Sequence, residues 1–192
     1  MIYLNDRISD IDIEQALTMV NVARRQKALA YRHENDQRLS LAVYMLLCEG
    51  LEKEYGITEK PELIYGDHGK PQLRDYPDIH FNMSHCKGAA LCVIDNRPVG
   101  CDIEMVSRKL NMSLCRYCCN EEEIDSVLSA DNPSLEFIKL WTQKEAVVKL
   151  LGEGLAGDVK DILQKARTEN VKIRTVVPPN KEYAYTIASL ER

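Results

Sequence analysis

The strongest helix prediction in the chain covers residues 135–151, LEFIKLWTQKEAVVKLL. At about 100° per residue its apolar side chains form one stripe that would face a core, and Gly152 and Gly154 would end the helix. The stripe contains Phe137, Leu140, Trp141, Val148 and Leu151. Lys144 falls inside this stripe, where an ammonium must snorkel to water, pair with an acid or bind a ligand.

An acid and a second base lie on the border of the same stripe. Glu145 and Lys149 are i, i+4 partners beside Trp141. An exposed ion pair on the helix surface would explain these two residues. It does not explain a lysine centred among apolar positions, so this helix is the first candidate for chemistry.

Residues 99–105, VGCDIEM, predict a strand with two carboxylates on one face. Alternation gives one face Val99, Cys101, Ile103 and Met105, and gives the other Gly100, Asp102 and Glu104. Carboxylates at i, i+2 lie roughly 7 Å apart, close enough to share a hard cation, and Gly100 would leave room beside them. A solvent-facing acidic strand edge is the alternative, and taken alone the pair favours it.

Residues 81–88, FNMSHCKG, predict a strand that ends in a polar turn. The hydroxyl of Ser84, the imidazole of His85 and the turn amides all donate hydrogen bonds that suit a phosphate. A hydrolytic pair is less favoured, because adjacent residues seldom form a nucleophile and its base. A structural histidine is the alternative for His85. The three segments together supply acidic ligands, a lysine and phosphate donors, which indicates metal-assisted phosphoryl transfer.

The amino-terminal part alternates between predicted helices and strands. The expected elements are an edge strand at 1–4, helices at 13–32 and 37–55, a turn at 66–71, and two or three strands within 79–104, broken at 84–87 and 96–98. Asn35 and Asp36 are candidates to cap the second helix, which Gly56 would end. Pro71 would break any regular element at the turn.

The carboxy-terminal part repeats the order of helix followed by strands. A helix is expected after Asn120, where the three glutamates 121–123 suit a first turn because the helix dipole favours anions. Residues 171–177 and 182–189 predict a hairpin around the turn at 178–180. No repeat is visible by identity, so a weak internal duplication stays open.

Length and charge limit the classes of protein. The 192 residues fit one large domain or two small halves, and the ordinary globular composition argues against disorder. Lys and Arg number 25 against 30 Asp and Glu, a net charge of −5, so we expect no nucleic-acid partner. No apolar stretch reaches membrane-spanning length and the acidic start is no signal peptide, so we expect a cytoplasmic protein without a membrane partner.

The seven cysteines are expected to be reduced thiols, because seven is odd and no export signal is present. Cys115, Cys118 and Cys119 cluster. A structural zinc site needs four ligands, and no second pair of ligands follows this cluster. We therefore expect buried small hydrophobic residues rather than a zinc site.

Four segments resemble, in order and spacing, the motifs of the 4′-phosphopantetheinyl transferases of the surfactin-synthetase-activating (Sfp) type. They are Gly69-Lys70-Pro71, residues 81–85 (FNMSH), residues 99–104 (VGCDIE) and residues 141–155 (WTQKEAVVKLLGEGL). Each shorter motif is weak alone, but four in order, with Trp-x-x-Lys-Glu-x-x-x-Lys intact, are specific. The match runs from about Arg24 to Leu155.

The resemblance implies a reaction. The family transfers the 4′-phosphopantetheine arm of coenzyme A to a serine of an apo acyl, peptidyl or aryl carrier protein and releases adenosine 3′,5′-bisphosphate. By resemblance, Asp102, Glu104 and Glu145 would hold Mg²⁺, and Mn²⁺ suits the same oxygen ligands. Coenzyme A would contact Gly69, Lys70, Pro71, Ser84, His85, Lys144 and Lys149.

The resemblance also assigns roles in catalysis. Glu145, Lys149 and His85 would be the catalytic residues, with either Glu145 or a metal-bound water as the base. A basic side chain from the first helical region would bind the 3′-phosphate of coenzyme A. The candidates are Arg24, Arg25, Lys27 and Arg38, and a solvated basic face is the equal alternative for residues 24–27.

The fold implied by the resemblance is α+β, a pseudo-dimer of two similar α/β halves. The halves are residues 1–97 and 98–192, the second carrying the metal ligands, with the active site in the cleft between them. A chain of this length is expected to be a monomer. Two rival functions stay open: a non-catalytic coenzyme A-binding sensor on the same scaffold, and a magnesium-dependent phosphohydrolase.

Overall fold

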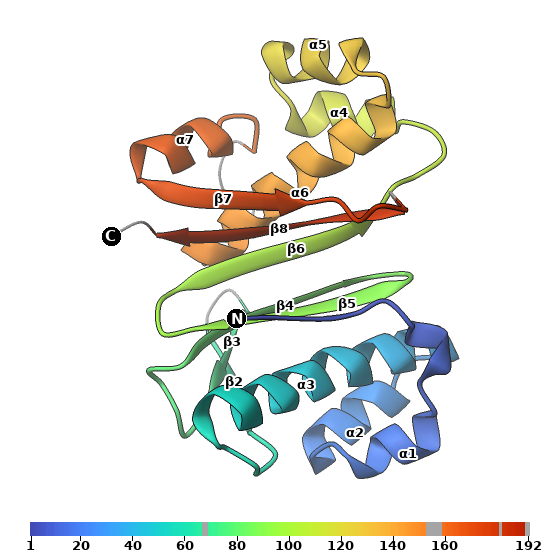
Figure 1. Cartoon of the computed structure of the whole chain (residues 1–192), viewed down its shortest axis with the longest axis vertical. Helices are drawn as coiled ribbons and strands as arrows, with labels where there is room; N and C mark the ends of the chain where they lie inside the picture. The colour runs from blue at the N-terminus through green and yellow to red at the C-terminus, as the bar shows by residue number, and fades with distance from the viewer. Residues whose placement is uncertain (67–68, 153–158, 181, 191–192) are drawn as a thin grey trace. The chain divides into compact units, whose positions relative to one another are not determined.

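The computed structural model describes residues 1–66, 69–152, 159–180 and 182–190. The chain forms two compact units, Met1–Val99 and Gly100–Arg192. Each unit contains a three-stranded sheet with helices on it (Figure 1). The predicted α+β class is therefore confirmed as a mixed architecture with antiparallel sheets.

The sheet of the first unit has the order β1-β5-β4. Its strands are β1 (Ile2–Asn5), β5 (Ala89–Asp95) and β4 (His80–Cys86), all paired antiparallel. The predicted edge strand at the amino terminus is confirmed. The predicted turn at 84–87 is wrong, because β4 continues through Ser84 and His85, which pair with Leu91 and Ala90. The chain turns instead at Lys87 and Gly88.

Helices of the first unit pack on this sheet. They are η1 (Ile8–Asp10), α1 (Ile13–Thr18), α2 (Val22–Leu29) and α3 (Glu34–Tyr55). The single helix predicted over 13–32 is wrong, because the side chain of Asn21 accepts a hydrogen bond from the Arg24 N–H and starts a new helix. The predicted caps Asn35 and Asp36 are also wrong, since His33 precedes the first turn of α3.

The buried face of α3 joins the sheet in one apolar core. Leu47 and Leu51 of α3 lie in a cluster with Cys92 and Ile94 of β5. Gly56 ends α3 with a φ of 68°, as predicted. This core fixes β4, which carries two of the predicted phosphate contacts.

A two-stranded hairpin pairs β2 (Leu63–Tyr65) with β3 (Pro71–Leu73). The expectation that Pro71 breaks regular structure is wrong, because it begins β3 opposite Tyr65, and the first residue of a strand tolerates a missing donor. Gly69 adopts a φ of 74°, as a turn glycine should. Asp67 and His68 of the predicted turn lie outside the described residues.

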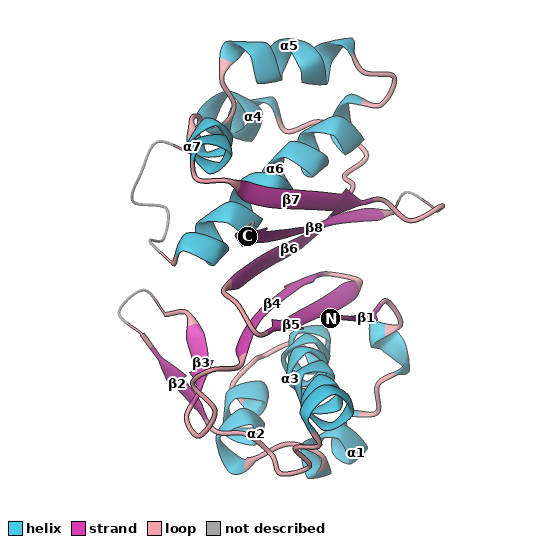
Figure 2. Cartoon of the chain, turned by 60° about the vertical axis from the view of Figure 1, so that its left-hand side comes forward, coloured by secondary structure: helices cyan, strands magenta, loops and turns pink. Residues whose placement is uncertain are grey.

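The sheet of the second unit has the order β6-β8-β7. Its elements are β6 (Val99–Met105), β7 (Val171–Val176), β8 (Tyr183–Leu190), α4 (Met112–Cys118), α5 (Glu121–Ser129), α6 (Pro133–Leu151) and α7 (Ile162–Thr168). The closing hairpin β7–β8 is confirmed. Figure 2 shows α6 lying on this sheet, with α7 beside it.

Helix α6 starts earlier than predicted, with Asn132 as its cap and Pro133 in the first turn. Gly152 ends it with a φ of 72°, whereas Gly154 lies outside the described residues. Helices α4 and α7 were not predicted. The helix expected after Asn120 is α5, which begins with a capping box between Asn120 and Glu123.

The three clustered cysteines are fully buried, as predicted, in a core with Val127 and Phe137. None of the helices in the described part of the chain is long and apolar enough to span a membrane.

Candidate functional site

The backbones of β6 and α6 touch at Gly100. A Cβ atom built there would lie 2.1 Å from the carbonyl oxygen of Ala146 and 2.4 Å from the amide nitrogen of Leu150. The expectation that Gly100 leaves room beside the carboxylates is therefore wrong, because the backbone of α6 fills that space. This close approach brings Asp102 of β6 beside the turn of α6 that carries Lys149.

Asp102 and Lys149 form a partly buried ion pair. The Nζ atom of Lys149 lies 2.5 Å from Oδ1 of Asp102, and the side chains are 29% and 5% exposed. The alternative of a solvent-facing acidic edge is thus wrong at Asp102. Burial lowers the pKa of Lys149, but the charge of Asp102, its hydrogen bond with Lys149 and the charge of Glu145 act together against burial, and the pKa is raised. Lys149 is therefore a cation at neutral pH.

Glu104 and Glu145 complete an acidic group with Asp102. Burial, followed by the charge of Asp102, raises the pKa of Glu104 to about 7, against the opposing charge of Lys149. Burial also raises the pKa of Glu145, with a further contribution from Asp102 and an opposing one from Lys149. The three carboxylates lie close enough to disfavour one another's charge. A cation bound among them would remove this cost.

The three carboxylates are the candidate ligands of a magnesium ion. Within the described residues, no group of three His, Cys, Asp or Glu side chains is already gathered around one metal position. Asp102, Glu104 and Glu145 nevertheless offer only oxygen donors, the type that magnesium prefers. These oxygen donors fit magnesium. In the structure, the positive charge beside Asp102 is the ammonium of Lys149.

Lys144 is engaged inside the protein. Its side chain is 1% exposed, and Nζ lies 2.9 Å from Oε2 of Glu123. Nζ also donates to the carbonyl oxygens of Val159 and Lys160, each at 3.0 Å. These contacts use all three donors of an ammonium, which leaves none for coenzyme A. The structure therefore gives the Lys144 ammonium protein partners, and its contact with coenzyme A stays a prediction.

The predicted phosphate contacts of the first unit lie on β4 and the β2–β3 hairpin. Ser84 is buried and His85 is exposed. Successive residues of a strand point to opposite faces, so these two side chains do not share one turn. The Nζ atom of Lys70 donates to the carbonyl oxygen of Val99 at 3.3 Å, and Gly69 is exposed. Of the predicted phosphate contacts in the first unit, the imidazole of His85 and the turn at Gly69 are exposed.

Arg24 is a buried cation that is 6% exposed. Within the described residues, its guanidinium contacts Tyr44 and Ser40 and no carboxylate. It lies 5.1 Å from the ring centre of Tyr44 and makes long hydrogen bonds of 3.4 and 3.5 Å to Ser40. Burial lowers its pKa. Such a charge favours the arrival of an anion.

The other basic candidates differ in their partners. Lys27 lies over the ring of Tyr65, 5.5 Å from its centre. Arg25 donates to the carbonyl oxygen of Leu17 at 3.1 Å. Arg38 donates to the carbonyl oxygen of Ile11 and pairs with Glu34. Arg38 is thus paired with a carboxylate, whereas no ion pair of the described residues neutralises Arg24, Arg25 or Lys27.

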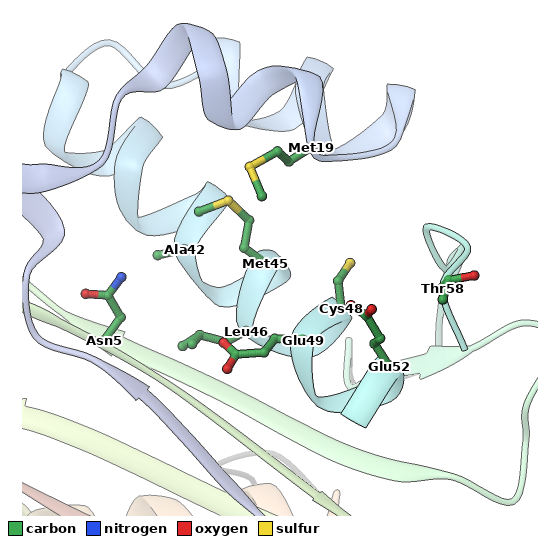
Figure 3. Close-up of a pocket in the computed structure, with 9 residues that line it drawn as sticks. All are labelled: Asn5, Met19, Ala42, Met45, Leu46, Cys48, Glu49, Glu52 and Thr58. Atoms are coloured by element: carbon green, nitrogen blue, oxygen red, sulfur yellow. The ribbon is translucent and has the colours of Figure 1, made fainter. Parts of the chain in front are cut away.

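A separate groove of about 390 Å³ opens beside α3 in the first unit (Figure 3). Its lining includes the thioethers of Met19 and Met45, and the carboxylate of Glu49. That carboxylate is already paired with Lys53 at 2.5 Å. None of the predicted site residues lines this groove, so it adds nothing to the candidate site.

Comparison with known proteins places this chain in a family. The profile of the 4′-phosphopantetheinyl transferase superfamily matches residues 98–190. The 4′-phosphopantetheinyl transferase gsp of Aneurinibacillus migulanus is 30% identical over 172 residues, which cover 88% of this chain and 70% of that protein. The chain belongs to the 4′-phosphopantetheinyl transferase superfamily.

Two further transferases show how the similarity is distributed. The 4′-phosphopantetheinyl transferase Sfp of Bacillus subtilis (strain 168) is 26% identical over 159 residues, 81% of this chain and 70% of the relative. The 4′-phosphopantetheinyl transferase AcpT of Escherichia coli (strain K12) is 37% identical over 104 residues, about half of each chain. The predicted Sfp-type membership is confirmed. As a transferase of this superfamily, the chain is an enzyme.

Proposed function

We propose that this phosphopantetheinyl transferase moves the 4′-phosphopantetheine arm of coenzyme A to a serine of an apo carrier protein, releasing adenosine 3′,5′-bisphosphate. The observation that carries the proposal is the group formed by Asp102, Glu104, Glu145 and Lys149, in which carboxylates and one ammonium are held together by the contact at Gly100. Oxygen donors beside a lysine suit the transfer of a phosphoryl group.

Asp102, Glu104 and Glu145 are the proposed ligands of Mg²⁺, or of Mn²⁺, which the same oxygens accept. When bound, the ion would neutralise charge on the pyrophosphate of coenzyme A. Burial and then the charge of Asp102 raise the pKa of Glu104 to about 7, and the part that comes from Asp102 and Glu145 supports a cation at this position. A proton bound to Glu104 must leave before this side chain serves as a ligand.

Lys149 is the proposed partner of the leaving phosphate oxygen. Its ammonium is protonated and already buried against Asp102 at 2.5 Å. During transfer, the carrier serine attacks the phosphorus next to the pantetheine, and negative charge grows on the leaving oxygen. Lys149 would donate a hydrogen bond, and finally a proton, to that oxygen. His85 would contact the pyrophosphate, and either Glu145 or a water would accept the serine proton.

Arg24 and Lys27 are the proposed ligands of the 3′-phosphate. Arg24 is buried with no carboxylate partner in the described part of the chain, and a dianionic phosphate would satisfy its guanidinium. Lys27, one turn further along α2, lies over Tyr65. Arg25 and Arg38 make shorter hydrogen bonds to carbonyl oxygens than Arg24 does, at 3.1 and 3.0 Å against 3.4 Å, and Arg38 also pairs with Glu34, which argues against both. The contacts of Gly69, Lys70, Pro71 and Ser84 with the nucleotide remain part of the proposal.

The proposal includes an arrangement for the whole enzyme. We infer a monomeric pseudo-dimer of the halves 1–97 and 98–192, with the substrates bound in a cleft between the halves and a cytoplasmic location. Both units consist of a long helix, α3 or α6, on a three-stranded sheet, which supports two similar halves. The scattering mass in solution tests the monomer, and a stable trimer would contradict it.

The direct test is the intact mass of an apo carrier protein after incubation with this enzyme, coenzyme A and magnesium. We expect the carrier to gain one phosphopantetheine group. Tight binding of coenzyme A with no gain would favour the sensor, the second candidate. Cleavage of coenzyme A without a carrier would favour a phosphohydrolase. An Asp102→Asn variant is the control, because it removes the partner of Lys149 and a proposed magnesium ligand.

A further inference from the structure

Lys144 makes three contacts to parts of the second unit that are distant in sequence. Its ammonium contacts Glu123 in the first turn of α5 and the carbonyl oxygens of Val159 and Lys160, beyond the end of α6. The same Oε2 atom of Glu123 accepts the Asn120 N–H at 2.9 Å, so the ion pair is built into the capping box of α5. One side chain thus ties α6 to α5 and to the segment before α7.

The two residues before Lys144 tie the same turn of α6 to the sheet. The hydroxyl of Thr142 lies 2.9 Å from that of Thr186 on β8. The Nε2 atom of Gln143 donates to the hydroxyl of Thr175 on β7 at 3.0 Å. Residues 142–144 therefore fix the rotation of α6 about its axis from the side of the sheet and from the side of α5.

Glu145 follows this tethered turn directly, and Lys149 lies one turn further. A rotation of α6 would carry both side chains away from Asp102 and Glu104 on β6. Metal sites need their ligands held within about 0.5 Å of the working geometry. A buried ammonium also costs more than an apolar side chain at this position, which points to a role beyond packing.

We propose that Lys144 is a positioning residue: its contacts with Glu123, Val159 and Lys160 set the rotation of α6 that presents Glu145 to the magnesium site. The inference rests on the proposed function, because it concerns the same site. In the structure the three donors of the Lys144 ammonium are used by protein groups. Lys144 acts through the helix backbone that carries Glu145.

The test is calorimetric titration of magnesium into the whole protein with saturating coenzyme A and no carrier. We expect Lys144→Met to weaken magnesium binding at least about tenfold, the lower end of the effect of residues that support metal ligands. The matched control is Lys139→Met on the same helix, which removes the 2.6 Å ion pair with Glu136 and should stay within about twofold of wild type. A role in stability alone would lower the number of sites titrated and leave their affinity unchanged.

A second variant covers the case in which Lys144→Met does not fold. Glu123→Gln keeps a hydrogen-bond acceptor in the capping box and removes only the charge, so it should fold and still weaken magnesium binding by several-fold. Wild-type affinity in either folded variant would overturn the positioning role while the proposed function stands. A wild-type protein that binds no magnesium with coenzyme A would overturn the proposed function together with this inference.

Discussion

A methyl group added at Gly100 should disable the site by separating β6 from α6. The Cβ atom of an alanine would lie 2.1 Å from the carbonyl oxygen of Ala146, and real Cβ contacts do not fall below 3.0 Å. The obstacle is backbone, so a rotamer change cannot relieve it. Helix and strand must move apart by about 0.9 Å, the difference between these two distances. A displacement of that size at a catalytic site costs on the order of 100-fold in rate.

The Gly100→Ala variant should also lose about 1–3 kcal/mol of unfolding free energy, as overpacked cores do. The assay compares kcat for carrier modification and urea unfolding with those of Gly66→Ala, because a Cβ at Gly66 meets nothing within 4 Å. Gly66→Ala should keep wild-type rate and stability. A Gly100→Ala enzyme that transfers at more than about one third of the wild-type rate would refute the account of how α6 and β6 build the site.

Three further predictions concern the acidic group, the buried arginine and the α5 cap. The folded-state pKa of Glu104 is raised from 4.5 to about 7, so metal-free protein should lose stability as pH rises between these two values. In urea unfolding, Glu104→Gln should therefore be up to about 3 kcal/mol more stable than wild type near pH 8 and equally stable near pH 4. Arg24→Met should raise KM for coenzyme A about 10–100-fold and leave KM for 3′-dephospho-coenzyme A unchanged. Arg25→Met is the control and should change neither KM. Equal effects of Arg24→Met on both substrates would contradict the 3′-phosphate assignment. Asn120→Ala removes the cap of α5 and should cost about 1 kcal/mol in thermal unfolding, with a change below about 0.3 kcal/mol arguing against the capping box.

Periodicity predicted the elements whose pattern is local. The helix at 135–151, the strand at 99–105 and the closing hairpin all appear with boundaries shifted by at most two residues. The glycines at 56 and 152 end helices with positive φ, where only glycine is free of steric cost. These features depend on neighbours in sequence, which one chain reveals.

Errors arose where a local signal had two outcomes. Asn21 starts a new helix because its side chain caps the Arg24 N–H, although the apolar pattern continues across it. Pro71 begins a strand, since its missing donor costs nothing at that position. Ser84 and His85 look like turn residues, but pairing with β5 keeps them in β4. The Asn21 cap is a local contact that competes with the apolar pattern, whereas pairing with another strand decided the structure at Pro71, Ser84 and His85.

In the candidate site, too, the sequence predicted features that depend on local spacing and missed those that depend on contacts between segments. Spacing indicates the carboxylate pair Asp102 and Glu104, and the family resemblance adds Glu145, whereas the role of Gly100 required the position of α6. Lys144 was flagged because a lysine interrupts an apolar stripe, but its partner Glu123 is 21 residues away and no spacing rule joins them. Arg24 became distinguishable from Arg25 only through its burial.

The central claim is that three carboxylates and the pyrophosphate of coenzyme A share one divalent ion. Electron–nuclear double resonance of Mn²⁺ added to the enzyme with coenzyme A measures this directly, through the coupling between the ion and nearby phosphorus nuclei. The account predicts one Mn²⁺ per chain with a phosphorus coupling, both lost in Asp102→Asn. An ion without phosphorus coupling, or one that binds equally well to the variant, would contradict it.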